Sequence, residues 1–273
     1  MLTKEIRQQI EHFVHQSPRT VQEVAVAIDK NWRTADRYIK EICEEFGTIA
    51  TKTFREGSRG ALKLVYWNAI AGMKGTSFQE RLKTLIESGR SKYDFSPMDI
   101  YQFADPQKRS ATIGKEKPHI EFRRLLENAQ QQVLFFSGNL SWINEDKKML
   151  PIIESLIKRN IKIKILTRID ITSIDTAQKL LKNNISHGDD ITGIRHCVQP
   201  LRGAIIDDTL ISIKEVYSPE RQVEIKEQTT INYFLRDSVW IYWLQKVFWH
   251  LWEPSVDAQT RIDALKTIEK EKK

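Results

Sequence analysis

Polar residues flank several hydrophobic runs in the second half of the sequence, and their types suit the binding of an anion. Ser137-Gly138-Asn139 follows one run, Arg168 follows a second, and Arg202 begins a third run that ends at Asp207. In an open α/β sheet the carboxyl ends of the strands line the ligand crevice. Two arginines beside a Ser-Gly-Asn turn would suit a phosphate, a carboxylate or a sugar. The alternative is that Arg202 and Asp207 form a buried structural pair and bind nothing.

A second group of polar and basic residues lies near the N-terminus and suits contacts with nucleic acid. Arg33 and Arg37 are one helical turn apart, where their guanidinium groups could read guanine or clamp phosphates. The candidate DNA contacts are Asn31, Trp32, Arg33, Thr34 and Arg37 on a predicted helix, and Arg55, Ser58 and Arg59 on a predicted hairpin. The alternative is that these are ordinary solvated charges, with Trp32 packed on the hairpin.

Helices and a hairpin would position this second group. Apolar residues recur along one face of residues 3–15, and along one face of two later segments that begin after Thr20 and Asn31, both good N-caps. Residues 48–67 alternate at period two on either side of Glu56-Gly57-Ser58-Arg59-Gly60, which predicts a hairpin with a glycine-rich tip. We therefore expect residues 1–68 to form an α+β domain.

Residues 24–49, VAVAIDKNWRTADRYIKEICEEFGTI, resemble the bipartite pattern of the winged helix-turn-helix family. The positions that match it are Val24-Ala25, Ile28, Thr34 and Tyr38-Ile39. Asp29 stands where a glycine is usual, although Asp tolerates the left-handed conformation better than most residues. The resemblance implies that the third helix enters the major groove of double-stranded DNA. The hairpin would then be a wing on the adjacent minor groove or phosphates.

Residues 69–118 differ from the sequence on either side. The part from residue 88 to residue 118 contains three prolines and two glycines and has no continuous hydrophobic periodicity. This composition predicts a short helix followed by a partly ordered linker, with dimerisation as a further role.

From residue 119 onward, hydrophobic strands alternate with amphipathic helices. The strand-like runs are VLFFS, IKIKILTRI, ITGIRHCV and TTINYFLRD, with LRGAIIDDTLISIKE as a hairpin and VWIYWLQKVFWHLWE as a long aromatic helix. The alternation predicts an α/β sandwich with a mixed sheet, covered on both faces, over residues 119–256. A charged tail is expected over residues 257–273. The fold class is therefore α/β overall, with a small α+β domain in front.

The order of these elements and the run from Pro200 to Asp208 resemble one half of the phospholipase D-like superfamily, whose active motif is H-x-K-x4-D. Asp207 matches the aspartate, Arg202 stands in the lysine position, and Pro200 occupies the position of the nucleophilic histidine. A proline ring cannot attack phosphorus, so the resemblance implies a domain without catalysis at that position. His196 lies four residues upstream and is a weak substitute.

A winged helix followed by a degenerate phospholipase D-like half is similar to the TrmB-like archaeal transcriptional regulators. The C-terminal strand and the aromatic helix ending in Leu-Trp-Glu fit the same comparison. The resemblance implies a homodimer whose second domain senses a small ligand or supports dimerisation. Homodimerisation is also favoured because active phospholipase D-like sites pair two halves and this chain has one.

Composition limits the partners. The 273 residues carry a formal net charge of +7, which favours a polyanionic partner without requiring one. Cys43 and Cys197 lie far apart without neighbours at metal-ligand spacing, so we expect no disulfide, metal site or cofactor. No run approaches the ~18 apolar residues of a spanning helix, and the N-terminus lacks a signal-peptide hydrophobic region. We expect a cytoplasmic protein without membrane contact.

The expected function is that of a DNA-binding transcriptional regulator, a homodimer with an inactive phospholipase D-like domain for effector sensing or dimerisation. One alternative is a nuclease or phosphodiesterase directed to DNA by the N-terminal domain, against which Pro200 argues. Another is an adaptor whose winged helix binds protein.

Overall fold

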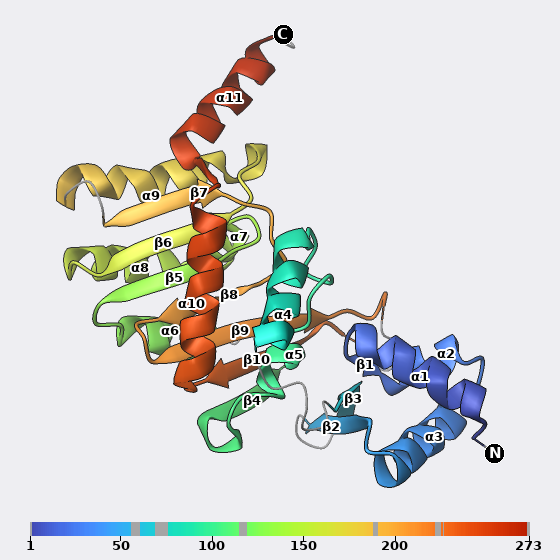
Figure 1. The fold of residues 1–273 in the computed structure, drawn as a ribbon. Coiled ribbons are helices and arrows are strands. Elements are labelled where there is room, and N and C mark those ends of the chain that lie inside the picture. Colours follow the sequence, from blue (N-terminus) through green and yellow to red (C-terminus); the bar gives the residue numbers. More distant parts are fainter. Residues whose placement is uncertain are drawn as a thin grey trace.

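The computed structural model describes residues 2–55, 61–68, 76–114, 119–187, 191–221, 225 and 227–271. A small N-terminal unit lies beside a large twisted sheet that has helices on both faces (Figure 1). The structure confirms the fold class, a mixed α/β protein with a small α+β unit in front of a large mixed sheet.

The second and third helices of the N-terminal unit begin at the caps that the sequence predicts. The helices of the unit are α1 (Lys4–Gln16), α2 (Val21–Ala27) and α3 (Trp32–Glu45). Thr20 and Glu23 form a reciprocal capping box at α2, and the Asn31 side chain accepts a hydrogen bond from the Thr34 amide at 2.9 Å. Asp29 has a φ of 52°, so this residue adopts the left-handed conformation in the turn before α3.

The small sheet connects the two parts of the molecule. It consists of β1 (Arg19–Thr20), β2 (Ile49–Arg55) and β3 (Ala61–Trp67), in the order β1-β3-β2. Ile49 and Val65 face the helices of the N-terminal unit. Phe54, Leu62 and Leu64 are buried in the core of the large domain. The hairpin therefore packs on the large domain along its length, which the sequence did not predict.

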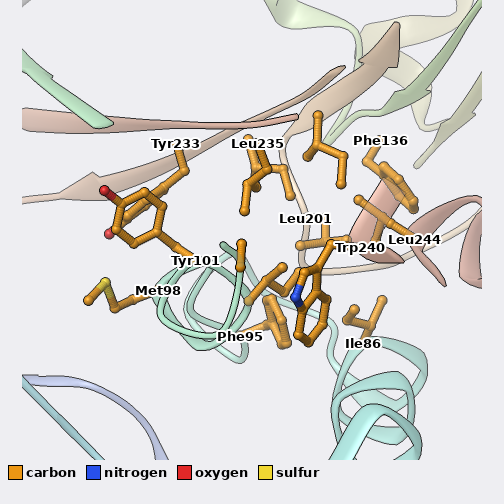
Figure 2. Close-up of a cluster of buried hydrophobic side chains, with 14 of the residues drawn as sticks. Ile86, Phe95, Met98, Tyr101, Phe136, Leu201, Tyr233, Leu235, Trp240 and Leu244 are labelled. Carbon is orange, nitrogen blue, oxygen red and sulfur yellow. The ribbon is translucent and has the colours of Figure 1, made fainter. Parts of the chain in front are cut away.

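The predicted linker forms part of the large domain. Residues 76–114 contain α4 (Thr76–Ser88), α5 (Met98–Tyr101), a 3₁₀ turn (Pro106–Lys108) and β4 (Arg109–Gly114). Strand β4 pairs antiparallel with β10 at one edge of the large sheet. Figure 2 shows Tyr101 beside Tyr233, and Ile86 and Phe95 beside Trp240, all in one buried cluster. The expectation of a partly ordered linker is wrong for these residues, because their scattered apolar side chains are buried in this core.

The large sheet has the order β11-β7-β6-β5-β8-β9-β10-β4. Its other strands are β5 (Gln132–Phe136), β6 (Lys162–Thr167), β7 (Thr192–His196), β8 (Gly203–Ile206), β9 (Leu210–Tyr217), β10 (Thr229–Leu235) and β11 (Val256–Asp257). Strands β5, β6 and β7 are parallel to one another, and the neighbouring pairs from β5–β8 to β10–β4 are antiparallel. The sheet is therefore mixed, as predicted.

Alternate residues of the sheet enter two separate cores. Phe136 and Tyr233 face α10 (Ser238–Trp252), α4 and α5. Phe135 and Phe234 face the opposite core. The helices on that side are α6 (His119–Glu127), α7 (Ser141–Glu145), α8 (Met149–Lys158) and α9 (Ile174–His187). Of the tryptophans on α10, Trp240 and Trp243 are buried and Trp249 is exposed, consistent with a mainly structural role for this helix.

The predicted charged tail also belongs to the fold. Val256 and Asp257 pair with β7 as β11, and Ala258–Glu271 form α11, which projects from the end of the sheet (Figure 1). Ala258 and Ile262 are buried in the same core as α8 and α9. The domain thus continues past residue 256. No helix among the described residues is long and apolar enough to cross a membrane.

Candidate anion-binding cavity and nucleic-acid interface

A cavity of about 410 Å³ opens on the sheet face opposite α10, above β5, β8, β9 and β10. Ser137, Asn139, Arg168 and Arg202 line it together, so the structure brings together four of the five candidate ligand residues. They come from the ends of strands β5 and β6 and from the residue before β8. Because β5 and β6 are parallel and β8 is antiparallel to β5, these three positions lie at the same edge of the sheet.

Arg202 lies flat over the turn after β5. Its Nη1 donates to the carbonyl oxygens of Gln199 and Leu201, at 3.0 and 2.6 Å. A Cβ on Gly138 would lie 2.7 Å from the Arg202 Nε, so the guanidinium occupies the space that any larger residue would need. Gly138 is thus required for the close approach of Arg202.

The cavity contains more positive charge than the sequence predicted. Lys92 and Lys214 also line it, and among the described lining residues Glu145 is the one carboxylate. Burial, with Arg168 nearby, lowers the pKa of Arg202. Burial also lowers the pKa of Lys214, and Arg202 and Lys92 act in the same direction while Glu145 opposes them. The cavity is therefore an electropositive, partly desolvated site.

The other candidates in the cavity are held by local contacts. The Ser137 hydroxyl accepts hydrogen bonds from the Leu140 amide at 3.2 Å and from the Trp142 indole at 3.0 Å. Asn139 accepts one from the Ser141 amide at 3.3 Å. Arg168 donates to Asp170 at 3.0 Å and is about half exposed. Ser137 thus positions the wall of the cavity, and Arg168 sits partly neutralised at its edge.

Asp207 does not belong to this site. It lies at the other end of β8 from Arg202, with a φ of 49°, and its carboxylate accepts hydrogen bonds from the backbone amides of Gln130, Gln131 and Gln132 at 2.8–3.2 Å. The expectation that it helps to bind a ligand is wrong, as is the alternative of an Arg202–Asp207 pair. The four residues of strand β8 separate the two side chains.

Pro200, in the position of the nucleophilic histidine, and His196, the weak substitute, are not among the residues that line the cavity. Pro200 is buried, and its ring packs where a Cβ on Gly89 would lie, 2.8 Å from the proline Cγ. The His196 Nδ1 accepts a hydrogen bond from the Ile169 amide at 2.9 Å. Burial lowers the pKa of His196, and Arg261 and Arg168 act in the same direction. His196 therefore positions the turn after β6.

The candidate DNA contacts on α3 form an exposed surface at its start. Arg33 and Arg37 are exposed, Thr34 is half-buried, and Trp32 is 45% exposed. The Asn31 side-chain oxygen is used in the cap. Asp36 is paired with Lys63 of β3 at 2.7 Å, so the acidic residue in this part of α3 is neutralised. In Figure 1, α3 lies on the side of the N-terminal unit away from the large sheet.

The hairpin candidates are only partly described. Arg55, the last residue of β2, is exposed. Ser58 and Arg59 lie outside the described residues. The neighbouring Phe54 is in edge-to-face contact with Tyr233 of β10, with ring centroids 6.2 Å apart. This contact fixes the orientation of the hairpin, and with it α3, relative to the large domain.

Polar groups also meet where the N-terminal unit contacts the large domain. Tyr233 donates a hydrogen bond to Glu215 at 2.8 Å. Burial, together with the nearby Glu215, raises the pKa of Asp99 to about 8, although Arg81 and Arg19 act in the opposite direction. Burial also raises the pKa of Glu215, against hydrogen bonds from Ser96, Tyr233 and Tyr217.

Sequence reasoning missed Lys214, Lys92 and Trp142. Lys214 had a visible signal, because Ser212 and Lys214 alternate with Ile211 and Ile213 in the strand. Lys92 and Trp142 had none, since they lie in irregular or short helical segments. The described residues hold no cluster of side chains that could ligate a metal ion.

The fold and these two sites define a mixed α/β protein in which a small α+β unit is joined to a large sheet domain. The sequence matches no family model and no curated protein.

Several solved structures are similar to it. One is a phospholipase D family member, Nuc from Salmonella typhimurium, with 10% identity and a TM-score of 0.43 over 55% of this chain and 98% of that chain. Another is TrmBL2, an archaeal chromatin protein described with a novel mode of DNA binding, with 14% identity and a TM-score of 0.42 over 93% and 94%. NucT from Helicobacter pylori has 13% identity and a TM-score of 0.40 over 55% and 98%. These values are too low to transfer functions or site residues.

Proposed function

We propose that the protein is a DNA-binding transcriptional regulator that acts as a homodimer and contacts double-stranded DNA through α3. The observation that supports this most strongly is the pair Arg33 and Arg37, exposed on successive turns of a helix that begins after a tight turn. A helix in this arrangement can place its N-terminal residues against base edges in the major groove. Lys40 extends the same face by another turn.

In this proposal the large domain senses a small effector in the electropositive cavity. Strand β9 offers a physical connection, because Ser212, Lys214 and Val216 face the cavity. The intervening Ile213 and Tyr217 face the core that contains Phe54, Leu62 and Leu64 of the hairpin. A ligand that shifts β9 would therefore act on the surface that holds the DNA-binding unit.

The proposal includes no hydrolytic activity. Its support is the placement of Pro200 in the interior and the use of His196 as a hydrogen-bond acceptor for the Ile169 amide. A nuclease would need a nucleophile beside the cavity cations. Degradation of duplex or single-stranded DNA by the purified protein, abolished in His196→Ala, would contradict this part.

Selection from random-sequence duplexes tests the DNA-binding part. The purified chain should enrich a motif over several rounds, and a palindromic motif with half-sites about one helical turn apart is expected of a homodimer. Sedimentation of the free protein should give twice the monomer mass. Steeply salt-dependent binding without a motif would mean nonspecific DNA packaging, and an absence of binding at low salt would favour the protein adaptor.

A further inference from the structure

The floor of the cavity holds two adjacent cations, and Glu145 is the one carboxylate among the described residues that line it. Lys214 and Arg202 are neighbours across the β8–β9 hairpin, where the Lys214 amide donates to the Arg202 carbonyl at 2.8 Å. Both side chains are only partly exposed, and both line the cavity. Among the hydrogen bonds between described residues, the Arg202 guanidinium donates to backbone carbonyls, and the Lys214 ammonium has no acceptor.

The surrounding carboxylates do not balance this charge. Asp170 is paired with Arg168 at the edge of the cavity, and Glu145 is left to oppose Arg202, Lys214 and Lys92 among the described lining residues. Holding like charges together in a partly desolvated site is costly unless a counter-ion binds between them. A neutral sugar would leave these charges unbalanced, and a carboxylate would balance one of them.

Aromatic side chains line the same cavity. Trp142 stacks on Phe135 with an interplanar angle of 25° and ring centroids 5.1 Å apart. Its indole is fixed by the hydrogen bond to Ser137, and Phe122, Met149 and Phe234 also line the cavity. A cavity of about 410 Å³ is far larger than a phosphate ion requires, and it lies within the size range of pockets for small organic ligands.

We propose that this cavity binds the phosphate monoester of a small organic molecule, with the phosphate on Arg202 and Lys214 and the organic part against Trp142. A phosphate monoester carries a charge of about −1.5 to −2 at neutral pH and three acceptor oxygens, which matches two cations. The Ser212 hydroxyl and the Asn232 amide lie on the same floor and are available as further donors. This inference specifies the effector part of the proposed function.

Titration calorimetry on the full chain, without DNA, tests the inference with four simple probes: phenyl phosphate, inorganic phosphate, benzoate and phenol. Phenyl phosphate should bind at least about tenfold more tightly than inorganic phosphate or benzoate, because it alone combines an aromatic ring with a phosphate that can contact both cations. Phenol should not bind measurably. Equal affinities for benzoate and phenyl phosphate would overturn the proposal, as would failure of phenyl phosphate to bind.

Variants locate the site. Arg202→Gln and Lys214→Gln should each weaken phenyl phosphate binding by about tenfold or more, because charge-assisted hydrogen bonds to the phosphate are lost. Lys158→Gln, which removes an exposed charge from α8, is the matched control and should bind normally. Circular dichroism melting establishes that each variant is folded. Unchanged binding in both cavity variants would refute the assignment. No DNA is present in this experiment. The phenyl phosphate result therefore does not depend on whether the protein binds DNA.

Discussion

The two groups of cations in this protein differ in how water and acidic groups surround them. On α3, Arg33 and Arg37 are exposed, and the nearby Asp36 is already paired with Lys63. In the cavity, Arg202 and Lys214 are partly buried, and Trp142 and Phe135 line the same cavity. Exposed cations suit a long polyanion and are screened by salt, whereas partly buried cations suit a small anion that replaces their water. In our proposals, the exposed group is the surface for DNA and the partly buried group is the site for a small phosphorylated ligand.

The hairpin β2–β3 joins these two regions, and breaking its contact should have the largest effect. Phe54 is buried against Tyr233, so Phe54→Ala should destabilise the protein by about 3–5 kcal/mol. Urea unfolding followed by far-ultraviolet circular dichroism measures this. Val26→Ala, at an exposed apolar position on α2, is the control and should change stability by less than about 0.5 kcal/mol. A similarly small loss in Phe54→Ala would mean that the hairpin does not dock in solution.

The cavity can be altered without changing its charge. Gly138→Ala places a methyl group against the Arg202 guanidinium, which must move away from its present position. Phenyl phosphate binding should weaken by about tenfold, or about 1.4 kcal/mol, whereas DNA binding through α3 should change little. Calorimetry with phenyl phosphate and a DNA-binding assay on the same variant make the comparison. Equal loss in both assays would show that the two regions are not separable by this substitution.

The contact between the regions should make stability depend on pH. Asp99 on α5 faces Glu215 of β9, Arg81 of α4 and Arg19 of β1, and its pKa is raised from 3.8 to about 8. Its contribution to stability is therefore fully present below pH ~4 and is lost as the pH rises through ~8. The slope is at most about 1.4 kcal/mol per pH unit, and solvent screening at this half-buried site reduces it.

Urea unfolding at pH 5.5, 7.0 and 8.5 measures this dependence. The wild-type protein should lose stability across the series, and Asp99→Asn, which cannot titrate, should lose less. Glu215 also has a raised pKa, so some dependence should remain in the variant. An identical slope of stability against pH in the two proteins would show that Asp99 does not cause the pH dependence.

The sequence was most informative where a local rule decides the structure. The caps at Thr20 and Asn31, the strand periodicities and the left-handed Asp29 all follow from short-range chemistry. The role of Asp207 was mispredicted because motif spacing says nothing about which end of a strand lines a cavity. The edge strand β4 was missed because its pairing partner, β10, lies more than 100 residues away in the sequence.

The cavity was only half predictable for the same reason. Ser137, Asn139 and Arg168 follow strands, so the topology places them together. Lys214 lies inside a strand, and its importance depends on which face of the sheet contains the cavity. The pattern of the strand gives the alternation, and the tertiary arrangement decides which face opens into the cavity.

The measurement that tests the central claim most directly is the salt dependence of DNA binding for three proteins. These are the wild type, the Arg33→Ala/Arg37→Ala variant, and Lys158→Ala/Lys182→Ala, which removes the same charge from α8 and α9. If α3 contacts DNA, the first double variant should lose about 1–3 kcal/mol of binding free energy for each arginine that reads a base. Where an arginine instead contacts a phosphate, the salt slope should fall by about one unit for each contact. The control should match the wild type. Equal losses in the two double variants would show a general charge effect and contradict the account.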